Sequence, residues 1–550
     1  MKNTSYKTRK LKKTSFLKNI AILLFAHIFI KILGVINKIY LTNKTGFGDE
    51  GNAIYSSAFQ VYALFLTISS IGIPNAVSKL ISERLAIGDT KGAQKVFKIA
   101  ILFFGIIGFL LSVILFTFAH KIAYEWIQIP EAELSLLALS PAIFFTSISA
   151  IIKGYFNGRE NLNVGANSQT IEQIFRTILT IALIEFIAQT TGLDTKVMAA
   201  GAAMASTISE ITCFAYLYRY YKSVKRDIAV EIKNSVNYKY KGIRQTIKEI
   251  LCVSLPMSIS PILGGINKNI DSMTIVRGLK NFMTDTEAIL QYGILSGKVD
   301  TLVSFPLSFN AAFTSTLIPV VSSAKANGNY ERAKKKIEFS MLVSVLIGLP
   351  CTVGMIVLAA PILRFLFPNQ PSGAFLLQIS SISITFLMLN QNINSVLLGL
   401  GKTVLPALCT IIGLIIKLVL NNILVPINPS TFILGGTAGA ATATVIYHIV
   451  SYFISIHILK KNLKIEFGIK NIIKPLIATA MTTIVIIFCY NKFLSIFSEN
   501  LCIIITITIS AIVYVILLLI LRVFSKNEIM LIPNGEKIYN ILKKLRIYKD

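Results

Sequence analysis

Lysines stand inside apolar stretches of this 550-residue chain, in two copies of nearly the same string. Residues 32–39 read ILGVINKI and residues 262–270 read ILGGINKNI. Each copy places an Asn-Lys pair, ending at Lys38 or Lys268, directly after a run of aliphatic residues. Two occurrences of a cation in the same apolar context indicate a shared task rather than a chance match.

The first copy carries a second lysine on the same helix face. Lys31, Gly34 and Lys38 are spaced by three and four residues, so in a helix they form one stripe. A cation near the bilayer centre costs about 2.5–3.5 kcal/mol on insertion scales and therefore requires a partner or a hydrated cavity. The pattern predicts a cationic cavity wall that receives an anion. The alternative is that each lysine extends its ammonium group to a membrane interface.

Other charges fall within apolar segments as well. Glu172 and Arg176 are four residues apart on one predicted helix and can pair with each other, as a structural pair or as a substrate contact. Lys417 has no acid nearby on its own helix, so another helix or the cavity must satisfy it. The predicted substrate-binding set is Lys31, Asn37, Lys38, Glu172, Arg176, Asn267, Lys268, Lys298, Asp300 and Lys417.

Helix-breaking residues predict where parts of the molecule move. The segment LPMSISPILGG at 255–265 places two prolines and two glycines inside one apolar stretch. We expect the helix to be interrupted there, beside the cavity, as in transporters that work by alternating access. The predicted gating and hinge residues are Gly34, Pro74, Pro256, Pro261, Gly264 and Gly265.

The elements that position these residues are membrane-spanning helices. The chain is 54% hydrophobic with a mean hydropathy of +0.68, and 15% of its residues are charged, against about 25% in soluble proteins. Its apolar runs are continuous rather than alternating, which favours helices over a β-barrel. We predict fourteen spans, at 19–41, 53–77, 97–119, 135–156, 167–189, 197–218, 247–270, 290–320, 337–360, 374–398, 404–425, 433–458, 471–491 and 500–522.

The distribution of positive charge predicts the topology. With the N-terminus inside, inner segments hold more lysine and arginine than outer loops by a ratio of roughly six to one. Both termini are therefore predicted in the cytoplasm of a bacterium, with the chain in the inner membrane. The net charge of +28 then reflects contact with anionic lipids, and no nucleic-acid partner is needed. The cysteines and histidines are scattered, so no metal site is predicted.

Internal repeats predict two lobes. GDTKGAQK at 88–95 resembles GNYERAKK at 328–335, in register with the lysine strings. Six spans separate the copies, so the halves have the same orientation, as in transporters whose substrate site lies between parallel repeats. We divide the chain into a basic N-terminus (1–18), an N-lobe (19–218), a cytoplasmic linker (219–246), a C-lobe (247–458), two further spans (459–522) and an amphipathic cytoplasmic tail (523–550).

Several strings resemble a known family. FIKILGVINKIYLTNKTG, GIPNAVSKLISE, KGYFNGREN and SQTIEQIFR are similar to the oligosaccharide flippases of the multidrug/oligosaccharidyl-lipid/polysaccharide exporter superfamily. Within it, the chain most resembles the branch of stage V sporulation protein B and the Gram-positive lipid II flippases. The resemblance implies an all-α fold of two six-helix lobes around a V-shaped cavity, followed by two additional helices. Where that branch carries arginines in spans two and eight, this chain has Leu64 and Thr301.

The resemblance also implies a function, which is to move an undecaprenyl-pyrophosphate-linked peptidoglycan precursor, lipid II, to the outer leaflet. This task belongs to cell-wall or spore-cortex synthesis. The chain would be a transporter, not an enzyme, and a monomer that meets membrane lipids and cell-wall polymerases. No cofactor is expected, and coupling to the membrane potential or to a monovalent cation stays open.

Three alternatives remain. The first is a flippase for another polyprenyl-linked oligosaccharide, such as a capsule, teichoic or exopolysaccharide unit. The second is a cation-coupled drug exporter of the same superfamily, which would use an acidic cavity. The third is a membrane enzyme, which the short loops and only 26 acidic residues disfavour.

Overall fold

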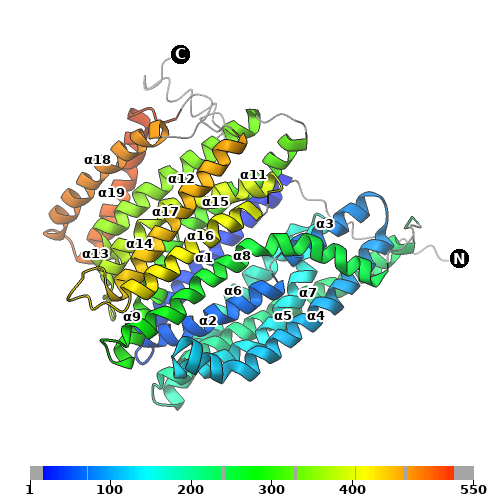
Figure 1. Cartoon of the computed structure of the whole chain (residues 1–550), viewed down its shortest axis with the longest axis horizontal. Helices are drawn as coiled ribbons and strands as arrows, with labels where there is room; N and C mark the ends of the chain where they lie inside the picture. Colours follow the sequence, from blue (N-terminus) through cyan, green and yellow to red (C-terminus); the bar gives the residue numbers. More distant parts are fainter. Residues whose placement is uncertain are drawn as a thin grey trace. The chain divides into compact units, whose positions relative to one another are not determined.

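A computed structural model describes residues 16–524 apart from 71, 234, 237–241, 327–330, 403 and 464–468. The predicted tail and nearly all of the basic N-terminus lie outside these residues, as does the side chain of Pro256. The described chain is helical throughout and contains no strand (Figure 1). The predicted fold class, an all-α polytopic membrane protein, is confirmed.

Contacts within the chain define two compact units, residues 1–297 and 298–550. The first unit contains α1 (Phe16–Asn43), α2 (Gly48–Ser70), α3 (Ile73–Ala86), α4 (Thr90–Lys121), η1 (Ile122–Ile127), η2 (Pro130–Ala132), α5 (Glu133–Gly158), α6 (Leu162–Thr190), α7 (Thr195–Lys233), α8 (Ile243–Leu279) and α9 (Asp285–Gly293). The π-helical turn η3 (Ile294–Val299) crosses the boundary between the units.

The second unit contains the remaining helices. They are α10 (Asp300–Ser304), α11 (Leu307–Ala326), α12 (Glu331–Val357), α13 (Ala359–Leu366), α14 (Ala374–Ser381), α15 (Ser383–Gly399), α16 (Val404–Leu424), α17 (Gly436–Leu463), α18 (Ile469–Leu494) and α19 (Glu499–Ile520).

Helix packing repeats between the units in the order that the sequence repeat predicts. In the first unit α5 packs against α3 and α4, and α6 packs against α7. In the second unit α15 packs against α11 and α12, and α16 packs against α17. The last two helices pair with each other, and α18 also packs against α12. Each unit thus contains the same arrangement of neighbours, built from helices at equivalent positions in the two halves of the sequence.

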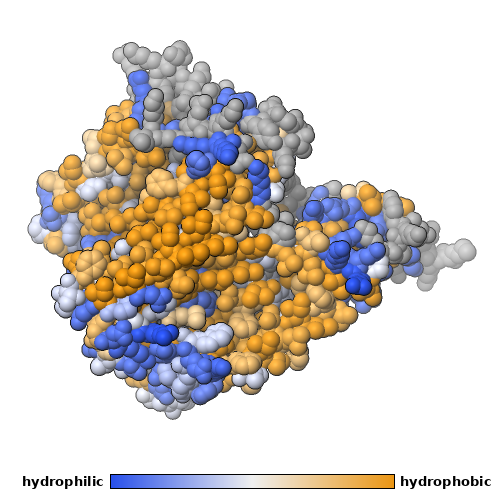
Figure 2. Space-filling view, viewed as in Figure 1, coloured by the Kyte–Doolittle hydropathy of each residue, from blue (hydrophilic) through white to orange (hydrophobic). Residues whose placement is uncertain are grey.

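In the described part of the chain, 10 helical segments are long and apolar enough to cross a membrane. Each of the fourteen predicted spans falls on helix, and the spans outside these 10 lie on α1, α6, α8 and the α9–α11 segment. These segments carry most of the predicted intramembrane charges. The count of fourteen stays a prediction. Figure 2 shows hydrophobic residues over the long sides of the helices and hydrophilic residues gathered toward helix ends.

The second predicted span contains a break at the position of Pro74. α2 ends at Ser70 and α3 begins at Ile73, with Gly72 at φ 88° between them. Proline in the first turn of a helix costs no hydrogen bond, so Pro74 fits the start of α3. A Cβ on Gly154 of α5 would lie 2.7 Å from the Pro74 carbonyl oxygen, so backbone packs directly on backbone at this break.

The predicted interruption at 255–265 is wrong, because α8 runs as one continuous helix from Ile243 to Leu279. Proline weakens the ladder of a helix without necessarily ending it, and packing along α2 supports α8. A Cβ on Gly265 would meet Leu64 of α2 at 3.4 Å, whereas one on Gly264 would meet no atom within 4 Å. A hinge role for Pro256, Pro261, Gly264 and Gly265 stays a prediction.

Candidate functional site

Helix α1 presents the predicted cationic stripe. Lys31 is exposed and Lys38 is half-buried, with Gly34 between them on the same face. A Cβ on Gly34 would lie 3.9 Å from Nε2 of Gln173, which places this face of α1 against α6. Asn37 is buried, and its Oδ1 accepts no hydrogen bond from the described residues. The stripe therefore combines two cations with a buried amide oxygen.

Helix α8 brings the second lysine string to the same place. Lys268 is half-buried, and its charge lies close enough to that of Lys31 for the two ammonium groups to repel each other. The neighbouring Asn267 is buried. Asn269 donates from Nδ2 to the carbonyl oxygen of Gln60 on α2, at 3.0 Å, and so fixes the rotation of α8. Lys268, from the second lysine string, thus lies within electrostatic range of Lys31, from the first.

Lys38 lies on a polar and aromatic surface of α2. Its Nζ donates to Oγ of Ser56 at 3.3 Å and lies 5.9 Å from the ring centroid of Tyr55. A cation over an aromatic face gains about 0.5–1 kcal/mol at partly exposed sites. Neither contact neutralises the charge of Lys38. The two contacts place Lys38 between the Ser56 hydroxyl and the Tyr55 ring.

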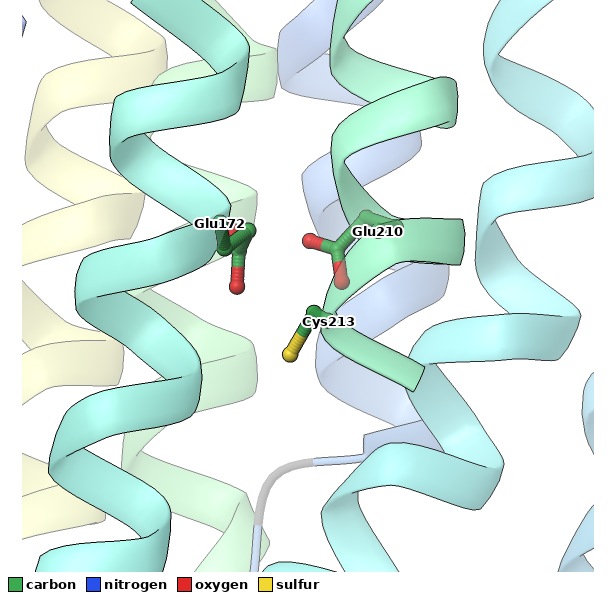
Figure 3. A group of neighbouring side chains, drawn as sticks. All are labelled: Glu172, Glu210 and Cys213. Carbon is green, nitrogen blue, oxygen red and sulfur yellow. The ribbon is translucent and has the colours of Figure 1, made fainter. Parts of the chain in front are cut away.

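A second group of charges lies deeper, among α5, α6 and α7. Arg176 Nη2 lies 2.7 Å from Glu172 Oε1 and 3.4 Å from Glu210 Oε1, and Lys153 Nζ lies 4.0 Å from Glu172 Oε2. The predicted pairing of Glu172 with Arg176 is confirmed. Figure 3 shows the two carboxylates pointing toward each other from α6 and α7, with Cys213 beside them. Two bases face two acids here, so this buried cluster is formally neutral and lacks the excess positive charge of the stripe.

The predicted cations of the second unit have other surroundings. Lys298 is fully buried and donates to the Gln370 carbonyl oxygen at 2.7 Å and to Ser372 Oγ at 3.2 Å. Lys417 is also fully buried, and Asp300 is half-buried. The contacts of Lys298 hold the loop before α14, which favours a structural role. A substrate contact for Lys298, Asp300 and Lys417 stays a prediction.

Sequence reasoning missed the partners that come from neighbouring helices. No periodic or motif signal singles out Tyr55, Ser56, Lys153 or Glu210. One signal was available, since an unpaired base in the middle of a predicted span requires an acid from a different span. Lys153 lies three residues before the end of the predicted span 135–156, so this rule does not single it out and does not identify its carboxylate.

The stripe can bind an anion. Lys31, Lys38 and Lys268 supply three positive charges from two helices, and Asn37 adds an amide at the same face. Lysine acts as a compact point charge with three donors, which suits phosphate oxygens. Because like charges repel in a medium of low dielectric, an anion between Lys31 and Lys268 removes an unfavourable interaction as well as adding two favourable ones.

Comparison with known proteins assigns the family. Residues 16–325 match the family described as "Polysaccharide biosynthesis protein". The chain belongs to this family. Residues 287–423 also match the MatE family, so both halves resemble transporters of one superfamily.

Two curated relatives extend along most of the chain. It is 26% identical over 529 residues to stage V sporulation protein B of Bacillus subtilis, covering 95% of this chain and 98% of that protein. It is 24% identical over 430 residues to the lipid II flippase MurJ of the same organism, covering 76% of this chain and 77% of that protein. The family membership and these relatives agree with a multi-pass protein of bacterial membranes.

A solved structure supports the fold. The lipid II flippase MurJ in an inward closed conformation superimposes with a TM-score of 0.62 at 18% identity, covering 90% of this chain and 98% of that one. At this identity the likeness concerns the fold alone. The arrangement of helices within each unit is therefore that of a known transporter fold of this family.

Proposed function

We propose that this protein is a flippase that carries a polyprenyl-pyrophosphate-linked oligosaccharide from the inner to the outer leaflet, and that the oligosaccharide is the lipid II peptidoglycan precursor. The single observation that carries the proposal is that Lys31 of α1 and Lys268 of α8 lie within electrostatic range of each other. Membership in a family of polysaccharide biosynthesis proteins supports a lipid-linked glycan as the cargo. The named activities of MurJ and its relatives support lipid II within that class.

The chemistry of the cargo fits the stripe. A pyrophosphate carries at least two negative charges and is far too polar to cross hydrocarbon unaided. Lysine ammonium groups replace part of its lost water, while an isoprenoid chain remains in the lipid. An inside-negative potential favours outward movement of negative charge by about 2.3 kcal/mol per charge per 100 mV. The potential, with or without a monovalent cation, is therefore the proposed source of energy.

The topology is part of the same proposal. Both termini lie in the cytoplasm, the lobes span 19–218 and 247–458, and 219–246 is the cytoplasmic linker between them. The chain acts as a monomer beside the cell-wall polymerases that consume its product. A flippase for another polyprenyl-linked glycan is the second candidate. Such glycans carry the same phosphate groups as lipid II, and the lysines do not distinguish one sugar from another. A cation-coupled drug exporter is disfavoured, because three lysines repel a cationic drug.

Complementation tests the proposal. The chain is expressed in a strain depleted of its own lipid II flippase, and outer-leaflet lipid II is scored by external labelling. Lys31→Gln, Lys38→Gln and Lys268→Gln are each expected to lower the labelling at least several-fold at equal protein level. Lys79→Gln is the matched control, since Lys79 is an exposed lysine of α3 with a weak ion pair to Glu83. It is expected to leave the labelling unchanged.

Each outcome decides between candidates. Restored labelling that is lost in the three variants supports both the cargo and the site. Restored labelling that survives all three substitutions refutes the site. A well-inserted chain that restores nothing refutes lipid II, and the other polyprenyl-linked glycans are then tested by the same labelling in strains that make them.

A further inference from the structure

The buried cluster of Lys153, Glu172, Arg176 and Glu210 contains one carboxylate oxygen without a partner. Glu210 is 4% exposed, and Arg176 contacts its Oε1 alone. The second oxygen, Oε2, is buried and makes no hydrogen bond to any described residue. An ionised oxygen left in this state is costly, and a bound proton removes that cost.

The groups that face Glu210 come from every helix packed closely against α7. A neighbouring carboxylate raises the cost of a negative charge on Glu210, and the two bases lower it. Tyr62 of α2 lies within electrostatic range and is buried. The facing groups are Tyr55 and Tyr62 on α2, Lys153 on α5, Glu172 and Arg176 on α6, and Cys213 on α7 itself.

A metal ion fits this place poorly. The donor atoms of Glu172, Glu210 and Cys213 lie within 4.8 Å of one another, which is close enough for a shared ion (Figure 3). Arg176 and Lys153 already bring two positive charges to the same carboxylates. A divalent ion would add its charge to a cluster that is neutral without it, whereas a proton adds one charge and needs one oxygen.

We propose that Glu210 is a proton-binding site whose occupancy is coupled to binding of the anionic cargo. A proton taken from water forms an O–H bond at Oε2, and its release returns it to water. The cluster changes from neutral to a net charge of +1, because Arg176 and Lys153 then share the single carboxylate of Glu172. Positive charge at the cluster strengthens anion binding, and by linkage the anion strengthens proton binding to the same degree.

A short series of contacts connects Lys38 of the stripe to the buried cluster around Glu210. Tyr55 lies beneath Lys38, and its hydroxyl is 3.1 Å from Ser206 Oγ on α7. Ser206 precedes Glu210 by one helical turn, and the Tyr55 hydroxyl also lies within electrostatic range of Arg176. The coupling rests on the proposed function, since it concerns the anion site, but the proton site itself does not.

The first measurement concerns the proton alone. Infrared difference spectra of the reconstituted full chain are recorded as the pH is lowered, to detect the band of a buried protonated carboxyl group. The band is expected in the wild type and in Glu185→Gln, whose carboxylate lies at an ion pair on the other end of α6. It is expected to vanish in Glu210→Gln. Identical difference spectra in wild type and Glu210→Gln refute the proton site.

The second measurement concerns the coupling, with undecaprenyl pyrophosphate in nanodiscs as the probe. Wild-type affinity is expected to rise by up to about tenfold per pH unit as the pH falls, beyond the titration of the probe itself. Glu210→Gln resembles the protonated state, so it should bind tightly and show the titration of the probe alone. A Glu210→Gln variant that keeps the wild-type pH dependence refutes the coupling.

A second variant protects the test from a folding defect. Glu210→Gln with Lys153→Met leaves the Glu172–Arg176 pair and restores neutrality, so it should bind weakly and without the extra pH dependence. Tight binding by this double variant contradicts the charge argument. A wild-type chain that binds no probe at any pH refutes the proposed function and the coupling together, and the infrared comparison still decides whether Glu210 takes up a proton.

Discussion

Lys44 and Glu185 form an ion pair, with Nζ 2.6 Å from Oε2, that joins the end of α1 to α6. Tyr40 donates its hydroxyl to the other oxygen of the same carboxylate at 2.6 Å. One acid thus holds Tyr40 of α1, the helix that carries the cationic stripe, and Lys44, the residue directly after this helix. Glu185 lies about two and a half turns beyond Arg176 on α6, so it is an anchor that is separate from the buried charges.

Replacing this anchor is expected to loosen α1. Glu185→Gln removes the charge that both partners use, and because the carboxylate is 43% exposed and screened by solvent, the unfolding temperature should fall only slightly. The measurement is thermal unfolding in detergent, followed by circular dichroism. Glu83→Gln serves as the control, because its pair with Lys79 is exposed and 3.9 Å long, and it should change nothing. If Glu185→Gln and Glu83→Gln change the unfolding temperature equally, Glu185 does not anchor α1.

The break between α2 and α3 should resist any side chain at Gly72. Gly72→Ala places a Cβ against Ser258 Oγ and 2.8 Å from the Ser254 carbonyl oxygen, at a positive φ. The combined strain is expected to cost about 1–3 kcal/mol of unfolding free energy. Gly264→Ala is the matched control, since a Cβ there meets nothing and a helical alanine gains up to about 1 kcal/mol over glycine. Similar unfolding temperatures for both variants would count against this account.

Substitution of Lys298 should affect the stability of the protein, whereas substitution of Lys268 should affect anion binding. Lys298→Met removes a donor from the buried Gln370 carbonyl, which should cost about 1–3 kcal/mol of stability while probe affinity stays unchanged. Lys268→Met should leave the unfolding temperature near that of the wild type and weaken binding of undecaprenyl pyrophosphate. Both are measured on the same purified samples. If Lys298→Met instead binds undecaprenyl pyrophosphate more weakly at unchanged stability, Lys298 contacts the substrate.

Tyr55 should act through both its ring and its hydroxyl. Tyr55→Leu removes the aromatic face beneath Lys38 and is expected to change probe affinity by about 2- to 5-fold. Tyr55→Phe keeps that face but loses the hydrogen bond with Ser206. It should preserve affinity at high pH and reduce the pH dependence of binding. A Phe variant with unaltered pH dependence would show that the hydroxyl does not link stripe and cluster.

The sequence predicted those features that depend on spacing along a single helix. The four-residue separation of Glu172 and Arg176 predicted a pair, and the structure contains it at 2.7 Å. The stripe of Lys31 and Lys38 lies on one face of α1 for the same reason. The matching helix neighbours within each unit also follow from the sequence repeat, because equivalent strings fold into equivalent helices.

Features that depend on contacts between helices were beyond the sequence. Nothing in the spacing of Lys153 identifies Glu172 as its neighbour, and Lys298 gave no sign that it bonds a loop 72 residues away. The predicted interruption of α8 was wrong for a related reason. Proline and glycine content reflects the local preference of the chain and not the packing of α2 against α8. Local signals thus describe each helix, and tertiary packing decides which charges meet.

Lys31 and Lys268 repel each other, and this repulsion affects which conformations the protein favours. The repulsion disfavours any state that narrows the space between the Lys31 side chain of α1 and the Lys268 side chain of α8. A phosphate group turns that repulsion into attraction. If the proposed function holds, the carrier is expected to change conformation readily with cargo bound and slowly without it, which would limit cycles that move no cargo.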